Sequence, residues 1–280
     1  SQETRRILDR IIGFKLSSLL QNKIKSRSAG RVQSSSLKLL VDQEKLINEF
    51  VPEEYWTMNI DLVKENIKLT ATLSGESKVK SEEETIKIEN SLGNTAEVIS
   101  IDKVRKVTES KPPFTTSTMQ QEAFNRYKFS TKKTAMVAQK LYEGIQLDTE
   151  IAGLITYMRT DSARLAPQFV EKAQSYISEN FGENYVGKTK TNKNKNVIQD
   201  AHEAIRPTSL TRTPESIKEY LTNDEYKLYS LIYNRALASL MSAKIDEVTT
   251  IKFNCNGIEL KVNGVVNVFN GYNALLKSKD

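Results

Sequence analysis

The sequence predicts a multi-domain α+β fold, in which a β-rich domain is interrupted by a helical insertion and preceded by a helical segment. Apolar residues recur at a helical period before residue 52 and again between residues 116 and 241. Alternation of apolar and polar residues, which is typical of strands, appears on both sides of that second stretch. The length of 280 residues exceeds what one hydrophobic core usually serves, so we expect two or three structural units.

The first segment, residues 1–50, is expected to be helical. It opens with the charged, helix-like run SQETRRILDR, and small residues around Gly30 then lead into a second helix over residues 33–50. The apolar residues of this second helix that recur near a helical period are Leu37, Leu40, Val41 and Ile47. Pro52 follows and ends the helix.

The β-rich domain is expected in two pieces, residues 51–112 and 246–280. Residues 55–61, 67–73 and 95–101 read as strands in the first piece, and residues 248–254, 258–262 and 265–269 do so in the second. We expect turns at Gly257 and Gly264. Consecutive prolines at 112 and 113 end the first piece, because proline cannot donate to a strand ladder.

Residues 113–245 form the predicted helical insertion. Local signals place three of its helices: Thr131 caps one that ends near Gly144, Pro167 begins one that ends at Gly182, and Thr222 with Glu225 forms a capping box for residues 223–241. Only two backbone crossings would join the insertion to the β-rich domain, which makes it a candidate for hinged motion.

Basic charge is concentrated in two regions, although the whole chain carries only +6. Residues 1–38 hold nine lysines and arginines against two acidic residues, and residues 111–245 hold 19 against 14. Residues 51–110 between them are acidic, with eight basic against twelve acidic residues. This distribution favours a nucleic-acid partner, while an acidic protein, an anionic lipid surface or ordinary solvated faces remain alternatives.

The cysteine and histidine counts exclude several classes of site. A single cysteine, Cys255, rules out a disulfide within the chain, and with His202 as the one histidine no multi-cysteine zinc pattern is possible. No apolar run approaches the ~18 residues of a membrane span. We therefore expect a protein of the reducing cytoplasm that has no membrane partner and binds no metal with this part of its chain.

Residues 182–189, GENYVGKT, match the P-loop pattern GxxxxGK[ST]. A P-loop follows a buried strand and opens a helix whose N-terminus binds the phosphates. Here a predicted helix ends at Gly182, so the context argues against nucleotide binding and Gly182 is interpreted as a helix C-cap.

Residues 153–162, GLITYMRTDS, carry the densest set of reactive groups. Tyr157 is one of 11 tyrosines, most of which we expect to pack in the core. Arg159 changes that expectation, because a guanidinium can favour a phenolate and neutralise a phosphoryl group under attack. In extended backbone residues 157 and 159 point to the same side.

Two further clusters suit phosphate binding. Residues 201–208, AHEAIRPT, place His202, Glu203 and Arg206 within five positions; a structural role for His202 is equally compatible with the sequence.

Residues 28–34, SAGRVQS, combine small residues with a following helix N-terminus. Upstream, Arg5, Arg6 and Arg10 share a helical face with Phe14, a possible stacking surface for bases, although an exposed basic helix would look the same.

Together these motifs resemble the type IA DNA topoisomerases, and specifically bacterial topoisomerase I. The resemblance runs from Arg5 to about Tyr272 through RRILDRIIGF, SAGRVQSSSLKLL, EFVPEEYW, PPFTTSTMQQEA, GLITYMRTDS and AHEAIRPT, in that order. The methionine in ITYMRTDS and the serine after SAGRVQ favour topoisomerase I over topoisomerase III.

The resemblance implies an ATP-independent enzyme that cleaves one DNA strand through a 5′-phosphotyrosyl link, passes a strand through the gap and religates, relaxing negative supercoils. The implied catalytic group is Tyr157 with Arg159, His202 and Glu203. The residues implied to bind DNA are Arg6, Arg10, Phe14, Ser28, Arg31, Gln33, Thr116, Ser117 and Arg206. A non-catalytic module that binds single-stranded DNA remains the alternative.

The resemblance also implies an architecture and partners. Residues 1–50 would begin the helical DNA-groove domain, residues 51–112 and 246–280 would form a β-rich arch, and residues 113–245 would be the helical domain that carries the tyrosine. The Mg²⁺ ligands are expected in a TOPRIM domain that this sequence does not contain. We therefore expect the chain to bind single-stranded or underwound DNA in the bacterial nucleoid as a monomer, without relaxing supercoils alone; the TOPRIM domain and the remainder of the groove domain are its expected partners.

Overall fold

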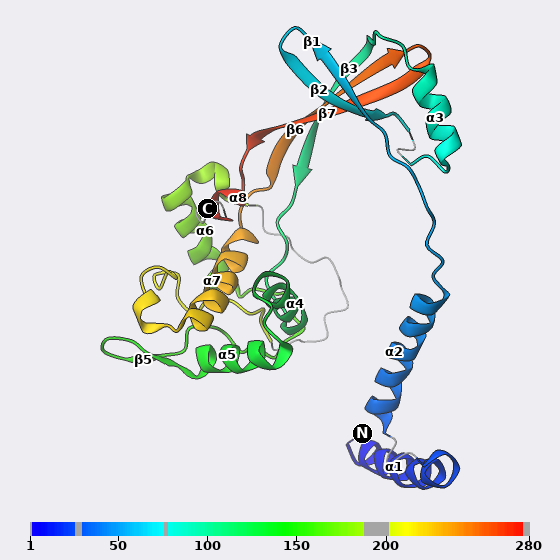
Figure 1. Cartoon of the computed structure of the whole chain (residues 1–280). Coiled ribbons are helices and arrows are strands. Elements are labelled where there is room, and N and C mark those ends of the chain that lie inside the picture. The colour runs from blue at the N-terminus through cyan, green and yellow to red at the C-terminus, as the bar shows by residue number, and fades with distance from the viewer. Residues whose placement is uncertain (1, 26–29, 76–77, 188–201, 277–280) are drawn as a thin grey trace. The chain divides into compact units, whose positions relative to one another are not determined.

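The computed structural model describes residues 2–25, 30–75, 78–187 and 202–276 and shows a mixed fold of helices and an antiparallel sheet (Figure 1). The chain divides into two compact units. The first comprises Ser1–Met58 and Glu76–Asn90, and the second comprises Asn59–Gly75 and Ser91–Asp280. The mixed helix and sheet composition predicted from the sequence is confirmed.

The first unit is built from the helices α1 (Gln2–Ile24), α2 (Arg31–Glu49) and α3 (Glu82–Ser91). No residue of α1 or α3 is buried. Gly30 caps α2 in extended conformation and contributes no side-chain hydrogen bond to the first turn. The sequence patterns did not predict α3, although the Ser81 hydroxyl accepts a hydrogen bond from the Glu84 N–H at its start.

A five-stranded antiparallel sheet in the second unit has the order β1-β2-β7-β6-β3. Its strands are β1 (Asn59–Lys64), β2 (Ile67–Leu73), β3 (Glu97–Thr108), β6 (Lys244–Cys255) and β7 (Ile258–Phe269). Leu73, Leu260 and Phe253 lie opposite one another across three strands and are buried, which gives this end of the sheet its own small core.

The predicted turn at Gly257 is confirmed, whereas the one at Gly264 is wrong. Gly257 has a φ of 88° in the tight turn that joins β6 to β7, a conformation that suits glycine. Gly264 pairs with Thr249 inside β7, which runs without interruption from Ile258 to Phe269. Ladder pairing with β6 therefore overrides the local turn preference of this glycine.

In the sequence, the helical part of the second unit follows β3 and precedes β6. These two strands pair with each other in the sheet (Figure 1). The elements of the helical part are α4 (Thr116–Tyr127), α5 (Thr131–Glu143), β4 (Ile145–Gln146), β5 (Ile151–Ala152), α6 (Pro167–Phe181), the 3₁₀ turns Glu183–Tyr185 and Lys218–Tyr220, and α7 (Asn223–Ala238). A last short helix, α8 (Asn273–Leu276), follows β7.

Local signals placed most of these helix ends correctly. Pro167 occupies the first turn of α6, and the capping box of Thr222 and Glu225 begins α7. The cap of α5 is Ser130 and not Thr131, because the Ser130 hydroxyl accepts from the Lys133 N–H at 3.2 Å. Gly182 follows α6 with a φ of 101°, so a helix and not a strand precedes the P-loop-like run, as the sequence indicated.

The main hydrophobic core of the described residues lies entirely between Phe114 and Met241. It includes Leu141 of α5, Ile177 of α6 and Leu228 of α7, all fully buried. Tyr272 and Leu275 pack against this core from the other end of the sequence. Part of the segment assigned from sequence to the β-rich domain therefore packs on the helical core.

None of the helices in the described residues is both long and apolar enough to cross a membrane.

Candidate active site

Three segments that are far apart in the sequence meet around Tyr157. Residues 154–160 are joined by backbone hydrogen bonds to Thr116 and to residues 206–208, and the segments around residues 114 and 205 are also bridged to each other. The Ile205 N–H donates to the Phe114 carbonyl at 2.8 Å, and Ile155 pairs with Pro207. The structure therefore brings together three of the motifs that the sequence singled out.

Exposure alternates along the run that carries Tyr157. The Tyr157 side chain is 41% exposed and Arg159 is exposed, whereas Met158 and Thr160 between and after them are buried at 4% and 7%. Met158 belongs to the main core and anchors the segment there. This alternation places Tyr157 and Arg159 on the solvent side, although the backbone bends at residues 156 and 158 and is not a regular strand.

Tyr142 in the last turn of α5 is the aromatic neighbour of Tyr157. The two ring centroids are 5.4 Å apart with an interplanar angle of 66°, an edge-to-face arrangement. Sequence reasoning missed this residue, because nothing local to positions 142 or 157 predicts that α5 ends beside the tyrosine run.

Thr116 joins the first turn of α4 to the backbone on both sides of Arg159. Its hydroxyl donates to the Met158 carbonyl at 2.7 Å, and the Thr160 carbonyl is a second acceptor at 3.0 Å. The same hydroxyl accepts from the Thr160 N–H at 2.9 Å. The hydroxyl that the resemblance assigned to DNA is therefore engaged by the protein's own backbone. Ser117, next to it, is exposed.

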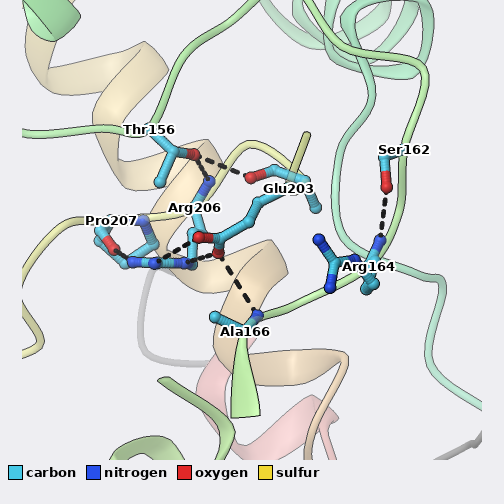
Figure 2. Close-up of polar contacts among 8 residues, drawn as sticks. Thr156, Ser162, Arg164, Ala166, Glu203, Arg206 and Pro207 are labelled. Carbon is cyan, nitrogen blue, oxygen red and sulfur yellow. Dashed lines mark hydrogen bonds and ion pairs between the residues drawn. The ribbon is translucent and has the colours of Figure 1, made fainter. Parts of the chain in front are cut away.

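Thr156 makes the corresponding connection on the other side of Tyr157 (Figure 2). Its hydroxyl donates to the Ala204 carbonyl at 2.8 Å and accepts from the Arg206 N–H at 3.0 Å. Thr156 lies within the motif GLITYMRTDS, but no role was predicted for it from the sequence. Hydroxyl-to-backbone bonds over 48 and 50 residues of separation leave no local pattern that could reveal them.

Glu203 and Arg206 form a two-pronged ion pair, shown in Figure 2. Arg206 Nε and Nη2 donate to the two carboxylate oxygens of Glu203 at 2.7 and 3.2 Å, and Nη1 donates to the Pro207 carbonyl at 3.0 Å. The guanidinium also lies 4.5 Å from the ring centre of Phe169 in α6. With its side chain 13% exposed, Arg206 is largely used in internal contacts.

The carboxylate of Glu203 also receives the backbone N–H of Ala166, the residue that caps α6, at 3.3 Å. Partial burial opposes ionisation of Glu203, but the hydrogen bonds and the charge of Arg206, together with the Ala166 N–H, outweigh it and lower the pKa of this carboxyl. Glu203 therefore ties the 202–208 segment to the start of α6 as an ionised group.

An open pocket of about 390 Å³ lies at the N-terminus of α4. It is lined by Thr116, Ser117, Arg159, Thr160, Asp161 and His202. Arg159 and the helix N-terminus both favour an anion here, and His202 can donate a hydrogen bond to one. Tyr157, Glu203 and Arg206 are not among the lining residues: Tyr157 is exposed outside the pocket, whereas Glu203 and Arg206 are paired with each other.

A separate pocket of about 930 Å³ lies in the first unit, along one face of α1. Its lining comprises Gln2, Arg5, Arg6, Asp9, Arg10, Gly13, Phe14, Ser17 and Gln21. The expectation that the three arginines share a helical face with Phe14 is confirmed, and the Phe14 ring is 75% exposed. Gln33 is exposed in the first turn of α2, whereas Ser28 and the side chain of Arg31 lie outside the described part of the chain.

Across the described ranges, no group of three or more histidine, cysteine, aspartate and glutamate side chains is arranged to hold a metal ion. Of the side chains that line the α4 pocket, Asp161 and His202 are the two of a type that commonly binds metal ions. The residues present in the pocket therefore suit an anion better than a cation site.

The comparisons with known proteins cover the whole chain. Residues 1–280 match a family model described as DNA topoisomerase. A solved structure of full-length topoisomerase I from Thermotoga maritima is similar, with 39% sequence identity and a TM-score of 0.81. The match covers 100% of the present chain and 45% of the T. maritima chain, so the chain spans less than half the length of that protein.

We expect Thr116→Val to lower the free energy of unfolding by about 1–3 kcal/mol, because the N–H of the buried Thr160 loses its hydroxyl partner. Thr116→Ser keeps the hydroxyl and is the matched control. Urea denaturation of the two variants measures the difference. Equal stability of the valine and serine variants would show that the Thr116 hydroxyl does not hold the tyrosine run.

Glu203 predicts a dependence of stability on pH. Because its pKa is lowered in the folded protein, the stability it adds is complete above its ordinary pKa of 4.5 and is lost as the pH falls through the lowered value. We expect the free energy of unfolding of Glu203→Gln to fall less steeply than that of the wild type below about pH 4.5. Glu171→Gln, at an exposed glutamate of α6, is the control and should follow the wild-type curve; identical curves for all three proteins would refute the assignment.

Proposed function

Because the chain belongs to the DNA topoisomerase family, we propose that it provides the nucleophilic tyrosine of a type IA enzyme, and that this residue is Tyr157. The observation that carries the proposal is the solvent-side placement of Tyr157 and Arg159 on a buried anchor, beside a pocket that favours anions. An exposed phenol with an arginine two residues away is the combination that attack on a phosphodiester needs.

In the proposed reaction the Tyr157 hydroxyl oxygen attacks the phosphorus of one DNA strand. The bond from oxygen to phosphorus forms, the bond from phosphorus to the 3′ oxygen breaks, the phenol loses its proton and the leaving strand ends in a 3′ hydroxyl. The product is a 5′-phosphotyrosyl link. One phosphodiester replaces another, so the exchange is nearly isoenergetic and the reverse reaction reseals the strand without ATP.

The pocket residues have roles that follow from their chemistry. Arg159 stabilises negative charge on the phosphoryl group, and His202 and Ser117 donate hydrogen bonds to phosphate oxygens at the α4 N-terminus. Glu203 and Arg206 act through position, because their charges are paired with each other. Thr116 acts in the same way through its hydrogen bonds to the backbone around Arg159.

Single-stranded DNA binding is proposed for the face of α1. Arg6 and Arg10 would contact phosphates and the exposed ring of Phe14 would stack on a base. Gln33, exposed in the first turn of α2, would also contact the DNA. For Ser28 and Arg31 of the same motif, DNA contacts are proposed from the resemblance alone. Basic and aromatic side chains on one helical face are typical of proteins that bind single strands with little sequence preference.

Complete strand passage would require parts of the enzyme beyond this chain, since the chain spans 45% of the T. maritima protein. We propose that Mg²⁺ is held in a separate TOPRIM domain and supplies charge neutralisation at the DNA. On this view residues 51–112 and 246–280 form an arch and residues 113–245 form the domain that carries the tyrosine and opens the gate. The 1–280 chain by itself would bind single-stranded DNA in the nucleoid without relaxing supercoils.

The decisive test of Tyr157 is a covalent adduct. Labelled single-stranded DNA is mixed with the 1–280 chain, its separately produced TOPRIM domain and Mg²⁺, and the products are separated on a denaturing gel. We expect an adduct with the wild type and none with Tyr157→Phe, because the variant lacks the attacking oxygen. Tyr55→Phe, at another tyrosine about half exposed, is the matched control and should keep the adduct.

An adduct that persists in Tyr157→Phe would move the nucleophile to another residue. Binding of DNA without an adduct in any of the three proteins would instead favour a non-catalytic module for single-stranded DNA. Relaxation of supercoiled DNA by the pure 1–280 chain with Mg²⁺ would contradict the proposed need for further domains.

The α1 face predicts a salt dependence of DNA binding. Each phosphate contact contributes about 0.7 to the slope of log K against log salt concentration for single strands. We expect Arg10→Ala to weaken binding and to reduce the slope by about that amount, as measured by fluorescence anisotropy at several salt concentrations. Arg105→Ala, at an exposed position of β3, removes the same charge as a control; an equal change in both slopes would refute a specific contact by Arg10.

A further inference from the structure

We propose that Tyr142 is a positioning residue that holds the ring of Tyr157 in the orientation from which its hydroxyl attacks the phosphate. This inference rests on the proposed function of Tyr157. It starts from the edge-to-face contact of the two rings, whose centroids are 5.4 Å apart. Tyr142 touches the nucleophile and not the DNA, so its effect is carried by the ring of Tyr157.

The backbone fixes the place of both rings. The Leu154 N–H donates to the Leu141 carbonyl at 2.7 Å, which joins the last turn of α5 to the start of the tyrosine run. A Cβ atom at Gly153 would lie 2.7 Å from the Tyr142 carbonyl oxygen, closer than real Cβ contacts allow. The absence of a side chain at Gly153 therefore permits the run to pass directly against Tyr142.

The connection between the two rings is short and structured. After α5 the chain turns at Gly144, with a φ of 136°, into the hairpin of β4 and β5, in which Ile145 pairs with Ala152. Arg212 Nη2 donates to Glu150 at 2.7 Å and holds the hairpin to the 210–217 loop. The separation of the rings is thus set by α5, by the hairpin and by the hydrogen bond between residues 141 and 154.

No hydrogen bond from the described residues holds the phenol of Tyr157. It is 41% exposed, and among the described residues its hydroxyl makes no hydrogen bond. A free phenol ring on exposed backbone samples several rotamers, and only some of them aim the oxygen at a phosphate. An edge-to-face partner restricts those rotamers and leaves the hydroxyl unoccupied for attack.

The contribution of Tyr142 requires its ring and not its hydroxyl. Edge-to-face packing depends on the quadrupole and shape of the aromatic ring, both of which phenylalanine keeps. Tyr142 is itself 40% exposed, so its truncation removes little of the core. The variants Tyr142→Phe and Tyr142→Ala therefore separate ring packing from chemistry by the phenol group.

The first measurement is the single-turnover rate of adduct formation in the mixture of the 1–280 chain, TOPRIM domain, Mg²⁺ and labelled single-stranded DNA. We expect Tyr142→Ala to lower this rate about three- to ten-fold, with the Kd for the DNA unchanged within about two-fold. Tyr142→Phe should stay within about two-fold of the wild type. Phe124→Ala removes an exposed ring of α4 as the matched control and should leave the rate unchanged.

The second measurement needs no catalysis. In the 1–280 chain with ¹³C-labelled tyrosine, the Tyr157 ring signals are assigned by their loss in Tyr157→Phe. We expect these signals to shift toward the values of a free tyrosine in Tyr142→Ala and to move much less in Tyr142→Phe. An unchanged Tyr157 signal in Tyr142→Ala would overturn the proposed ring contact.

The outcomes separate the two proposals. If the wild type forms the adduct and Tyr142→Ala forms it at the same rate, the positioning role is wrong while the function of Tyr157 stands. A loss in Tyr142→Phe as large as that in Tyr142→Ala would assign the effect to the hydroxyl and overturn ring positioning. If the wild type forms no adduct, the proposed function and this inference fall together.

Discussion

The hydrogen bonds that join residues 154–160 to two other segments are the constraint on which the candidate site depends. This run is neither a helix nor a regular strand, so its backbone groups need partners from elsewhere in the chain. On one side of Tyr157 the Thr156 N–H donates to the Arg206 carbonyl at 3.0 Å, and the Thr156 hydroxyl bonds the backbone of Ala204 and Arg206. On the other side the Thr116 hydroxyl bonds the backbone of Met158 and Thr160. Tyr157 is the exposed residue between two fixed points.

This arrangement separates residues that can meet a substrate from residues that hold them. Glu203 and Arg206 are the side chains that a search for acid, base and phosphate-binding groups would select first, yet they neutralise each other, and Glu203 accepts the N–H of Ala166 at the start of α6. An ion pair of low exposure costs desolvation, which additional hydrogen bonds from Ala166 and to Pro207 offset. The groups left toward solvent are Tyr157, Arg159 and the α4 pocket.

Local features were predictable from the sequence where one residue, or a few neighbouring ones, decide the backbone. The structure contains the elements that three such signals predicted: α6 from Pro167, α7 from the capping box of Thr222 and Glu225, and β2 from the alternation over residues 67–73. Gly264 misled because ladder pairing outweighs turn preference, and α3 was missed although Ser81 and Glu84 carry its capping signal. The residue types of the site were likewise visible, but the contacts of Tyr142, Thr116 and Thr156 depend on tertiary packing and leave no local trace.

The position of the core bears on how the candidate site would keep its geometry during the proposed opening of the gate. All the residues of the main core lie between Phe114 and Met241, and so do both threonine connections and the pair of tyrosines. This region leaves the sheet after β3 and returns at β6, which are adjacent strands. Bending near those two strands would leave the hydrogen bonds around Tyr157 intact. It would have to accommodate the packing of Tyr272 and Leu275 on the core and the ring contact of Phe269 in β7 with Tyr185. The proposed nucleophile and its supporting contacts, built on one core, would then be displaced together without loss of alignment.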